Sequence, residues 1–391
     1  MKIVVSGGWS YGNLGDDAIL EATSVLLRRH APSAEIVWTA YDVGLAKDSG
    51  IELAGALLPS VHRFLDRTHS FWMLQTVGKC RGYSQWPRFW GKRFRRYVRP
   101  LFEAVDAWRD RVEDPSDAFK GADVFLMSGG GYFNRWPSMF RARMRELELA
   151  HANGCRTVLL GQSIGPFSSE QHEQLRKTLS RDDRICVRDE ESVGELGGLG
   201  FSAELAPDLA LGVPESVPRI PGLVTVVPGE LDPRRVETVV EQLVGLKRTL
   251  GDGLRLRLIQ TCDIWSDVVS VRAVADGLRK RGVESEMVMP HDYRQLVSAI
   301  RGSEWVLSRR MHGMVIGWRS GSRVFSFTTS RKIVGFLRQI GCPDDICAES
   351  DWDRLAESFS AAFRREEASG EELRKKLAGD VDAAFRRMIT G

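Results

Sequence analysis

The sequence predicts an α/β protein built from two doubly wound domains, each a mostly parallel sheet covered by helices on both faces. Three observations lead to this prediction. Short apolar runs alternate with stretches whose apolar residues recur at helical spacing, which is typical of βαβ units. The alternation restarts after a proline-rich stretch near the middle of the chain. A chain of 391 residues is also longer than one hydrophobic core usually serves.

The first domain is predicted over residues 1–212 and begins with a short buried strand from Ile3 to Ser6. The run from Asp16 to Arg29 has apolar residues at helical spacing, and glycines fill the connection before it. Further strands are expected at 35–39, 124–127, 157–160 and 184–187, with helical runs between several of them. Strands that alternate with helices pair in parallel.

Residues 213–221 form the predicted linker, because they lie in a proline-rich stretch that contains prolines 207, 214, 218 and 221. A second α/β domain is expected over 222–350. Its strands are predicted at 223–227, 254–260, 286–289, 305–308 and 324–327, and its helices near 233–250, 267–281, 292–301, 310–319 and 331–340. Two polar helical runs, about 352–366 and 370–389, close the chain within a C-terminal helical segment, 351–391.

The composition excludes a disordered or fibrous chain, since 43% hydrophobic and 27% charged residues are ordinary for a globular protein. The 55 basic and 52 acidic residues leave a net charge of only +3, so no nucleic-acid partner is expected. The amino end does not look like a signal peptide, and no stretch approaches ~18 uninterrupted apolar residues, which predicts a cytoplasmic protein. Six cysteines without C-x-x-C spacing favour reduced thiols over a zinc site or disulfides.

A basic, aromatic insertion is predicted in the first domain at about 62–111. Between Asp66 and Glu103 there is no acidic residue, while arginines and lysines alternate with aromatic residues. A surface of this kind over 67–102 suits peripheral contact with anionic lipid at the inner face of the membrane. It suits an anionic glycan or a phosphorylated acceptor equally well. An amphipathic helix that packs its aromatic residues on the first domain explains the pattern just as well.

The connection between the first strand and the first helix reads Gly12-Asn13-Leu14-Gly15-Asp16-Asp17. It lies at the carboxyl edge of the predicted sheet, where α/β folds bind ligands. One interpretation makes Asp16 or Asp17 the helix N-cap. The other assigns one of them to a sugar hydroxyl, as hydrogen-bond acceptor or general base. The glycine spacing is no dinucleotide fingerprint and no Walker lysine follows, which argues against those nucleotide sites.

Two more glycine-bearing loops are predicted at the same edge. Ser128-Gly129-Gly130-Gly131 follows one strand, and Gly161-Gln162-Ser163-Ile164-Gly165-Pro166 follows the next. Glycines in such loops leave room for a ligand or for a neighbouring backbone. A tight structural turn is the alternative for the three consecutive glycines. Gln162 is a candidate to contact substrate through its amide.

Cations follow two other predicted strands. Arg188 comes directly after the strand at 184–187, where a guanidinium can bind carboxylate or phosphate through two hydrogen bonds. A salt bridge to Asp189 or Glu191 is the alternative.

The stretch Ser308-Arg309-Arg310-Met311-His312-Gly313 collects cations and an imidazole at a strand–helix junction. The helix N-terminus adds partial positive charge, so an anionic ligand is favoured and would help His312 to hold a proton. A single histidine is more often structural, but its position beside Arg310 favours a catalytic role. Lys332 is a further cation after the next strand.

In their order these motifs resemble the polysaccharide pyruvyl transferases, which move the pyruvate unit of phosphoenolpyruvate onto a sugar as a ketal. The resemblance also includes residues 187–192, 206–208, Lys332 and 335–336. It covers nearly the whole chain except the basic insertion and the last helices. It departs at 224–228, where an arginine is expected at the end of the strand.

The resemblance implies two Rossmann-like domains facing across a cleft, as in the GT-B glycosyltransferases, with the acceptor on the first domain and the donor on the second. It implies phosphoenolpyruvate as co-substrate, no required cofactor or metal, and a sugar or lipid-linked glycan acceptor. It places donor recognition on Arg188 and Arg310 and a general-acid role on His312. The other candidates are Asp16 and Asp17 for catalysis, Lys332 for the donor, and Asn13, Gly15, Gly130, Gly131 and Gln162 in the cleft loops.

Two alternatives stay open at this point. One is a nucleotide-sugar glycosyltransferase on the same two-domain frame. The other is a non-catalytic glycan- or lipid-binding relative that keeps the fold.

Overall fold

The structure, a computed structural model, describes residues 1–7, 13–40, 53–56, 116–133, 137–212, 216–262, 267–365 and 370–391. The chain divides into two compact units, each assembled from separate stretches. Unit 1 consists of Met1–Gly12, Ile19–Leu209 and Asp380–Gly391, and unit 2 of Asn13–Ala18 and Ala210–Gly379. The whole predicted insertion at about 62–111, with its basic, aromatic segment 67–102, lies outside the described residues.

Unit 1 is built on a seven-stranded sheet in the order β3-β2-β1-β4-β5-β6-β7, and its strands pair in parallel. The strands are β1 (Lys2–Ser6), β2 (Glu35–Ala40), β3 (Leu53–Ala56), β4 (Val124–Phe133), β5 (Arg156–Ile164), β6 (Arg184–Val187) and β7 (Glu204–Leu205). The order turns back between β1 and β4, so the segments after these two strands flank the switch point where α/β sheets bind ligands.

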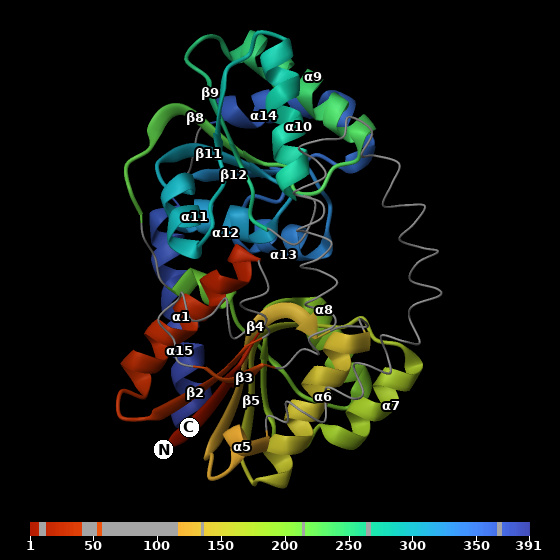
Figure 1. Ribbon diagram of the computed structural model, residues 1–391, viewed down its shortest axis with the longest axis vertical. Helices are drawn as coiled ribbons and strands as arrows, with labels where there is room; N and C mark the ends of the chain where they lie inside the picture. Colours follow the sequence, from red (N-terminus) through yellow and green to blue (C-terminus); the bar gives the residue numbers. More distant parts are fainter. Residues whose placement is uncertain are drawn as a thin grey trace. The chain divides into compact units, whose positions relative to one another are not determined.

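Local side chains cap several helices of unit 1. They include α1 (Leu14–His30), α5 (Ser116–Phe119), α6 (Pro137–Ala152), α7 (Ser169–Thr178) and α8 (Glu190–Leu199). Ser168 and Gln171 form a capping box at the start of α7. Asp189 caps α8, and Gly200 ends it with a φ of 86°. Helix α6 packs against β4 and β5, and α8 against β5 and β6 (Figure 1).

Unit 2 is built on a five-stranded parallel sheet in the order β10-β9-β8-β11-β12. Its strands are β8 (Ile220–Val227), β9 (Arg255–Ile259), β10 (Ser285–Val288), β11 (Ser303–Ser308) and β12 (Arg323–Ser326). Its helices are α9 (Pro233–Leu250), α10 (Asp267–Lys280), α11 (Tyr293–Ile300), α12 (Met311–Arg319), α13 (Arg331–Gln339), α14 (Leu355–Arg364) and the first part of α15 (Glu371–Thr390), whose remainder from Asp380 onward belongs to unit 1. The order turns back between β8 and β11, so Pro228 and Arg309 follow the two strands at this switch point.

Each unit encloses its own hydrophobic core. Phe125 and Phe133 are fully buried in unit 1. In unit 2, Phe359 meets the rings of Trp305 and Phe325 edge to face. In the part of the chain that the structure describes, no helix combines the length and the apolar character needed to cross a bilayer.

The predicted strands and helices are confirmed, but the two glycine segments are not loops. Gly129–Gly131 lie inside β4, and 161–164 lie inside β5, with Gly130 opposite Gln162 in the ladder. A Cβ on Gly129 would lie 3.1 Å from the carbonyl oxygen of Gly161. The close approach of a neighbouring backbone therefore explains Gly129, and the alternative of a tight turn at 128–131 is wrong.

Candidate functional site

The start of helix α1 is attached to unit 2 and brings Asp16 close to His312. Nδ1 of His312 lies 4.0 Å from Oδ1 of Asp16. Leu14 donates its amide to the carbonyl oxygen of Thr261 at 3.1 Å, and Asn13 forms an antiparallel bridge with Cys262. A segment from the beginning of the chain therefore supplies a carboxylate next to the histidine at the end of β11.

Gly15 leaves the space that the ring of His312 occupies. A Cβ at Gly15 would overlap Nδ1, Cβ and Cγ of the histidine. The His312 side chain lies in the first turn of α12 and is 11% exposed. The imidazole therefore packs directly against the backbone of α1 at Gly15. This contact explains why a glycine directly precedes Asp16 in the sequence.

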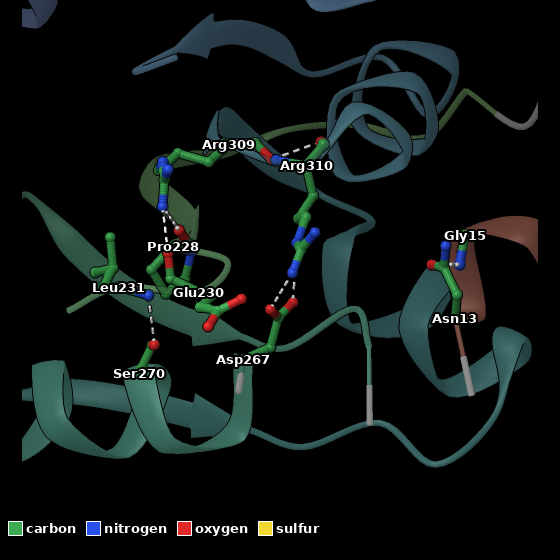
Figure 2. Close-up of polar contacts among 10 residues, drawn as sticks. Asn13, Gly15, Pro228, Glu230, Leu231, Asp267, Ser270, Arg309 and Arg310 are labelled. Atoms are coloured by element: carbon green, nitrogen blue, oxygen red, sulfur yellow. Dashed lines mark hydrogen bonds and ion pairs between the residues drawn. The ribbon is translucent and has the colours of Figure 1, made fainter. Parts of the chain in front are cut away.

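Asn13, rather than Asp16 or Asp17, caps α1. Gly15 donates its amide to Oδ1 of Asn13 at 3.2 Å (Figure 2), and Nδ2 of Asn13 donates to Oδ2 of Asp16 at 2.7 Å. The interpretation of Asp16 or Asp17 as the N-cap is wrong, because the helix begins at Leu14. Both carboxylates lie in the first turn, where negative charge is stabilised by the helix dipole.

The neighbouring residues Arg309 and Arg310 have different partners (Figure 2). Nη1 of Arg309 donates to the carbonyl oxygens of Pro228 at 3.3 Å and Glu230 at 2.5 Å. Arg310 instead donates through Nε to Oδ2 of Asp267 at 3.2 Å, and through Nη2 to Oδ1 of the same carboxylate. Arg309 therefore holds the segment after β8 in place, while Arg310 is the better candidate to meet a ligand.

Both segments at the switch point of unit 2 contribute to the position of Arg310. Gly229, after β8, has a φ of 63°, and a Cβ there would lie 3.1 Å from Nε of Arg310. The glycine thus permits both the turn and the passage of the arginine side chain. Lys332 is exposed in the first turn of α13.

In unit 1, Arg188 is held inside the domain. Its side chain is 3% exposed, its Nε donates to Oγ of Ser163 at 2.8 Å, and its Nη1 donates to the carboxylate of Asp208. The alternative of a salt bridge to Asp189 or Glu191 is wrong, because the salt-bridge partner is Asp208.

Gln162 is also buried, and its amide nitrogen donates hydrogen bonds to the neighbouring strand β4. Nε2 donates to the carbonyl oxygens of Met127 at 3.1 Å and Ser128 at 3.0 Å, and the residue is fully buried. Gly130 and Gly131 lie on the adjacent strand β4. These predicted cleft residues thus form part of the sheet of unit 1.

The thiols and acids of the described residues do not gather into a metal site. No group of three His, Cys, Asp or Glu side chains there is arranged to hold a metal ion. Cysteines 155, 186, 262, 342 and 347 are free thiols. Burial raises the pKa of Cys186 to about 12, so this thiol stays protonated at neutral pH.

Three solved structures illustrate the proteins that share this fold. A UDP-GlcNAc 2-epimerase from Neisseria meningitidis, bound to UDP-GlcNAc, is 10% identical, with 100% of this chain and 99% of that chain covered and a TM-score of 0.54. Acinetobacter baumannii MurG is 13% identical, with 99% of this chain and 99% of that chain covered and a TM-score of 0.50. The spinosyn rhamnosyltransferase SpnG, complexed with thymidine diphosphate, is 13% identical, with 100% of each chain covered and a TM-score of 0.51. These structures confirm the GT-B class of fold and, at such low identity, the fold alone.

The family comparison reaches further than the fold. None of the curated proteins compared with the chain matches it. The model of the family described as polysaccharide pyruvyl transferase, however, matches residues 13–331. The matched stretch begins at the cap of α1, contains Arg188, Arg310 and His312, and ends one residue before Lys332. The chain belongs to the polysaccharide pyruvyl transferase family.

Proposed function

We propose that the protein transfers the pyruvate unit of phosphoenolpyruvate to hydroxyls of a sugar or glycan intermediate, as a ketal, and releases phosphate. Membership of the family supports the transfer of a pyruvyl group. The observation that carries the assignment of the site is the imidazole of His312, 4.0 Å from the carboxylate of Asp16. A carboxylate at that distance stabilises the imidazolium, which is the form that can donate a proton.

The proposed reaction begins with proton transfer from His312 to the methylene carbon C3 of the donor. The resulting oxocarbenium-like centre at C2 accepts a sugar hydroxyl, whose proton passes to a base. The C2–O bond to phosphate then breaks, and a second hydroxyl adds at C2 and loses its proton. C3 has gained one proton, the two hydroxyls have lost two, and phosphate carries away the difference.

The acidic residues of α1 divide between two proposed roles. Asp16 faces His312 at 4.0 Å and is proposed to orient its imidazole. Asp17, in the same turn and half-buried, is the remaining candidate to orient or deprotonate the acceptor hydroxyl.

The cations are assigned to the donor, which carries a phosphate and a carboxylate. Arg310 is the first candidate because its side chain is 33% exposed and directly precedes α12. Lys332 is exposed in the next helix of the unit. Arg188 is the weakest of the three, because its charge is paired with Asp208 and its side chain is 3% exposed.

The test is a reaction with phosphoenolpyruvate and a panel of sugars and lipid-linked glycans, followed by phosphate release and the mass of the acceptor. We expect His312→Ala to abolish phosphate release. The melting temperature should stay close to that of the wild type, because the ring packs against Gly15 and not in the hydrophobic core of the unit. His291→Ala is the matched control, since His291 is an exposed histidine of the same unit. Full phosphate release by His312→Ala would remove the assignment.

The same incubations separate the proposed function from its alternatives. Transfer from a uridine or guanosine diphosphate sugar, without use of phosphoenolpyruvate, would identify a glycosyltransferase. Binding of a glycan or lipid without any phosphate release would identify a non-catalytic relative. The cytoplasmic location and the peripheral membrane contact through 67–102 stay predictions from the sequence, and sedimentation with anionic vesicles tests the latter.

A further inference from the structure

Asp267 is a fully buried carboxylate whose partner is the guanidinium of Arg310. It is the first residue of α10 and is 0% exposed, while the Arg310 side chain is 33% exposed. Oδ2 accepts from Nε of Arg310 at 3.2 Å and Oδ1 accepts from Nη2. The two residues are 43 positions apart in the chain.

The bidentate contact occupies one edge of the guanidinium. Nε and the near N–H of Nη2 point to Asp267. Among the described residues, Nη1 and the outer N–H of Nη2 make no hydrogen bond to protein. That outer edge presents two parallel donors, the geometry that binds two oxygens of a phosphate or carboxylate.

Burial of Asp267 is costly unless its charge is compensated. Burial raises the pKa of this carboxyl, and the attraction of Arg310 opposes the shift. A carboxylate in such a position holds its partner firmly, because an alternative position of Arg310 would leave a buried charge without hydrogen bonds.

We infer that Asp267 is a positioning residue of the donor site, which fixes the guanidinium of Arg310 so that its outer edge faces the phosphate or the carboxylate of phosphoenolpyruvate. The inference rests on the proposed function. A long arginine side chain loses conformational entropy when it binds an anion. Because the contact with Asp267 already restricts the rotamers of Arg310, less entropy is lost when the anion binds.

Positioning and simple charge balance predict opposite effects for Asp267→Asn. If the carboxylate acted only as a counter-charge, its neutralisation would strengthen the attraction of Arg310 for an anion and lower the KM for the donor. If it positions the guanidinium, the KM for phosphoenolpyruvate rises, by about tenfold or more, while kcat changes much less. Tenfold corresponds to about 1.4 kcal/mol of binding free energy.

The experiment measures KM and kcat for phosphoenolpyruvate in Asp267→Asn, Arg310→Lys and the double variant, together with their melting temperatures. Lysine lacks the planar fork, so the double variant is expected to have the KM of Arg310→Lys alone. Asp276→Asn is the matched control, since Asp276 lies on the same helix and pairs with Arg279 at 3.0 Å on the surface. Its KM should equal that of the wild type.

The outcomes distinguish this inference from the proposed function. A wild type that neither releases phosphate nor binds phosphoenolpyruvate overturns the proposed function, and the inference with it. An active wild type with an unchanged or lower KM in Asp267→Asn overturns only the role of Asp267. Should Asp267→Asn fail to fold, Asp267→Glu decides, because it keeps the negative charge but moves the carboxylate: a KM for phosphoenolpyruvate equal to that of the wild type contradicts positioning by Asp267. In a folded double variant, a KM well above that of Arg310→Lys contradicts an action through Arg310.

Discussion

At the scale of single residues, the missing side chain of Gly15 has as much influence on the site as the charged groups around it. The imidazole of His312 packs where a Cβ would stand, and Asp16 follows one position later on the same helical turn. The separation between acid and histidine is therefore set by backbone packing. A position set by backbone packing varies less than the position of a long lysine or glutamate side chain, which suits the role proposed for His312.

Gly15→Ala tests this arrangement. Alanine favours a helix over glycine by about 1 kcal/mol and the clash with His312 costs about 1–3 kcal/mol, so the unfolding free energy should fall by at most about 2 kcal/mol. The ring must move, however, and we expect kcat to fall by about tenfold or more. Phosphate release and the melting temperature check both expectations. In Gly194→Ala, where nothing lies within 4 Å of the new Cβ, kcat should be unchanged.

The sequence alone could predict the candidate site residues, but it could not predict which side chains they contact. The motif around His312 and the acidic start of α1 carry recognisable residue types next to a predicted strand end. Asp267 carries no such signal, because it is an isolated acid that becomes a partner only when the fold brings it to an arginine. Asp208 belongs to the motif at 206–208, but nothing in the sequence pairs it with Arg188. Asp267 reaches Arg310 from 43 residues away and Asp208 reaches Arg188 from 20. Long-range pairing of this kind depends on the fold and not on local pattern.

At the scale of elements, helix α15 shows how one segment closes unit 1. Asp382 on this helix accepts from Nη1 of Arg29 at 2.5 Å and lies 2.9 Å from Nε2 of His30, both at the end of α1. Phe385, one turn further, lies against the ring of His30. The amino-terminal and carboxyl-terminal helices of the chain are thus joined by charge as well as by apolar packing.

The pair between α1 and α15 predicts a pH dependence. Burial acts to raise the pKa of Asp382, but the hydrogen bonds and charges of His30 and Arg29 outweigh it, so the pKa is lowered from its ordinary value of 3.8. A depressed pKa stabilises the fold above the unfolded value and ceases to do so as the pH falls through the folded value. Asp382→Asn should lower the unfolding free energy at pH 7 by at most about 1 kcal/mol. Denaturant midpoints at pH 7 and in strong acid measure it, and a difference that persists in acid contradicts the assignment.

Elements were predictable where the pattern was apolar and less so where it was glycine-rich. The strands β8, β11 and β12 are short apolar runs, and their positions follow from the sequence directly. The ends of β4 and β5 contain glycines, which favour loops in most contexts. The ladder of a parallel sheet needs only backbone groups, so the strands continue through them, and the glycines allow close backbone contact instead.

At the scale of the whole molecule, the chain passes between its two units at four points: after residues 12, 18, 209 and 379. Unit 1 needs the last twelve residues, Asp380–Gly391, to complete its core. The buried apolar residues of that stretch are Val381, Ala384, Phe385, Met388 and Ile389. Neither unit is a single continuous stretch of sequence.

Removal of residues 380–391 should therefore unfold unit 1. Each large apolar side chain contributes about 1.5–3 kcal/mol when buried, and together they approach the 5–15 kcal/mol that stabilises a typical domain. We expect the shortened chain to aggregate or to melt far below the full one, as measured by circular dichroism and limited proteolysis. A chain that ends at Ile389 is the control, and a full-length melting profile for the 379-residue chain would contradict the prediction.

The attachment of the first turn of α1 to unit 2 limits how such proteins can be recombined. A hybrid that takes only residues 210–379 from a second parent would set the recipient's Asn13, Gly15 and Asp16 against a foreign histidine and a foreign segment after β9. Residues 13–18, near the amino end, have to come from the same parent as 210–379, because both belong to unit 2. Hybrids designed at a single crossover near the central prolines will therefore split the acid–imidazole pair between two ancestries, even when both parents are fully functional.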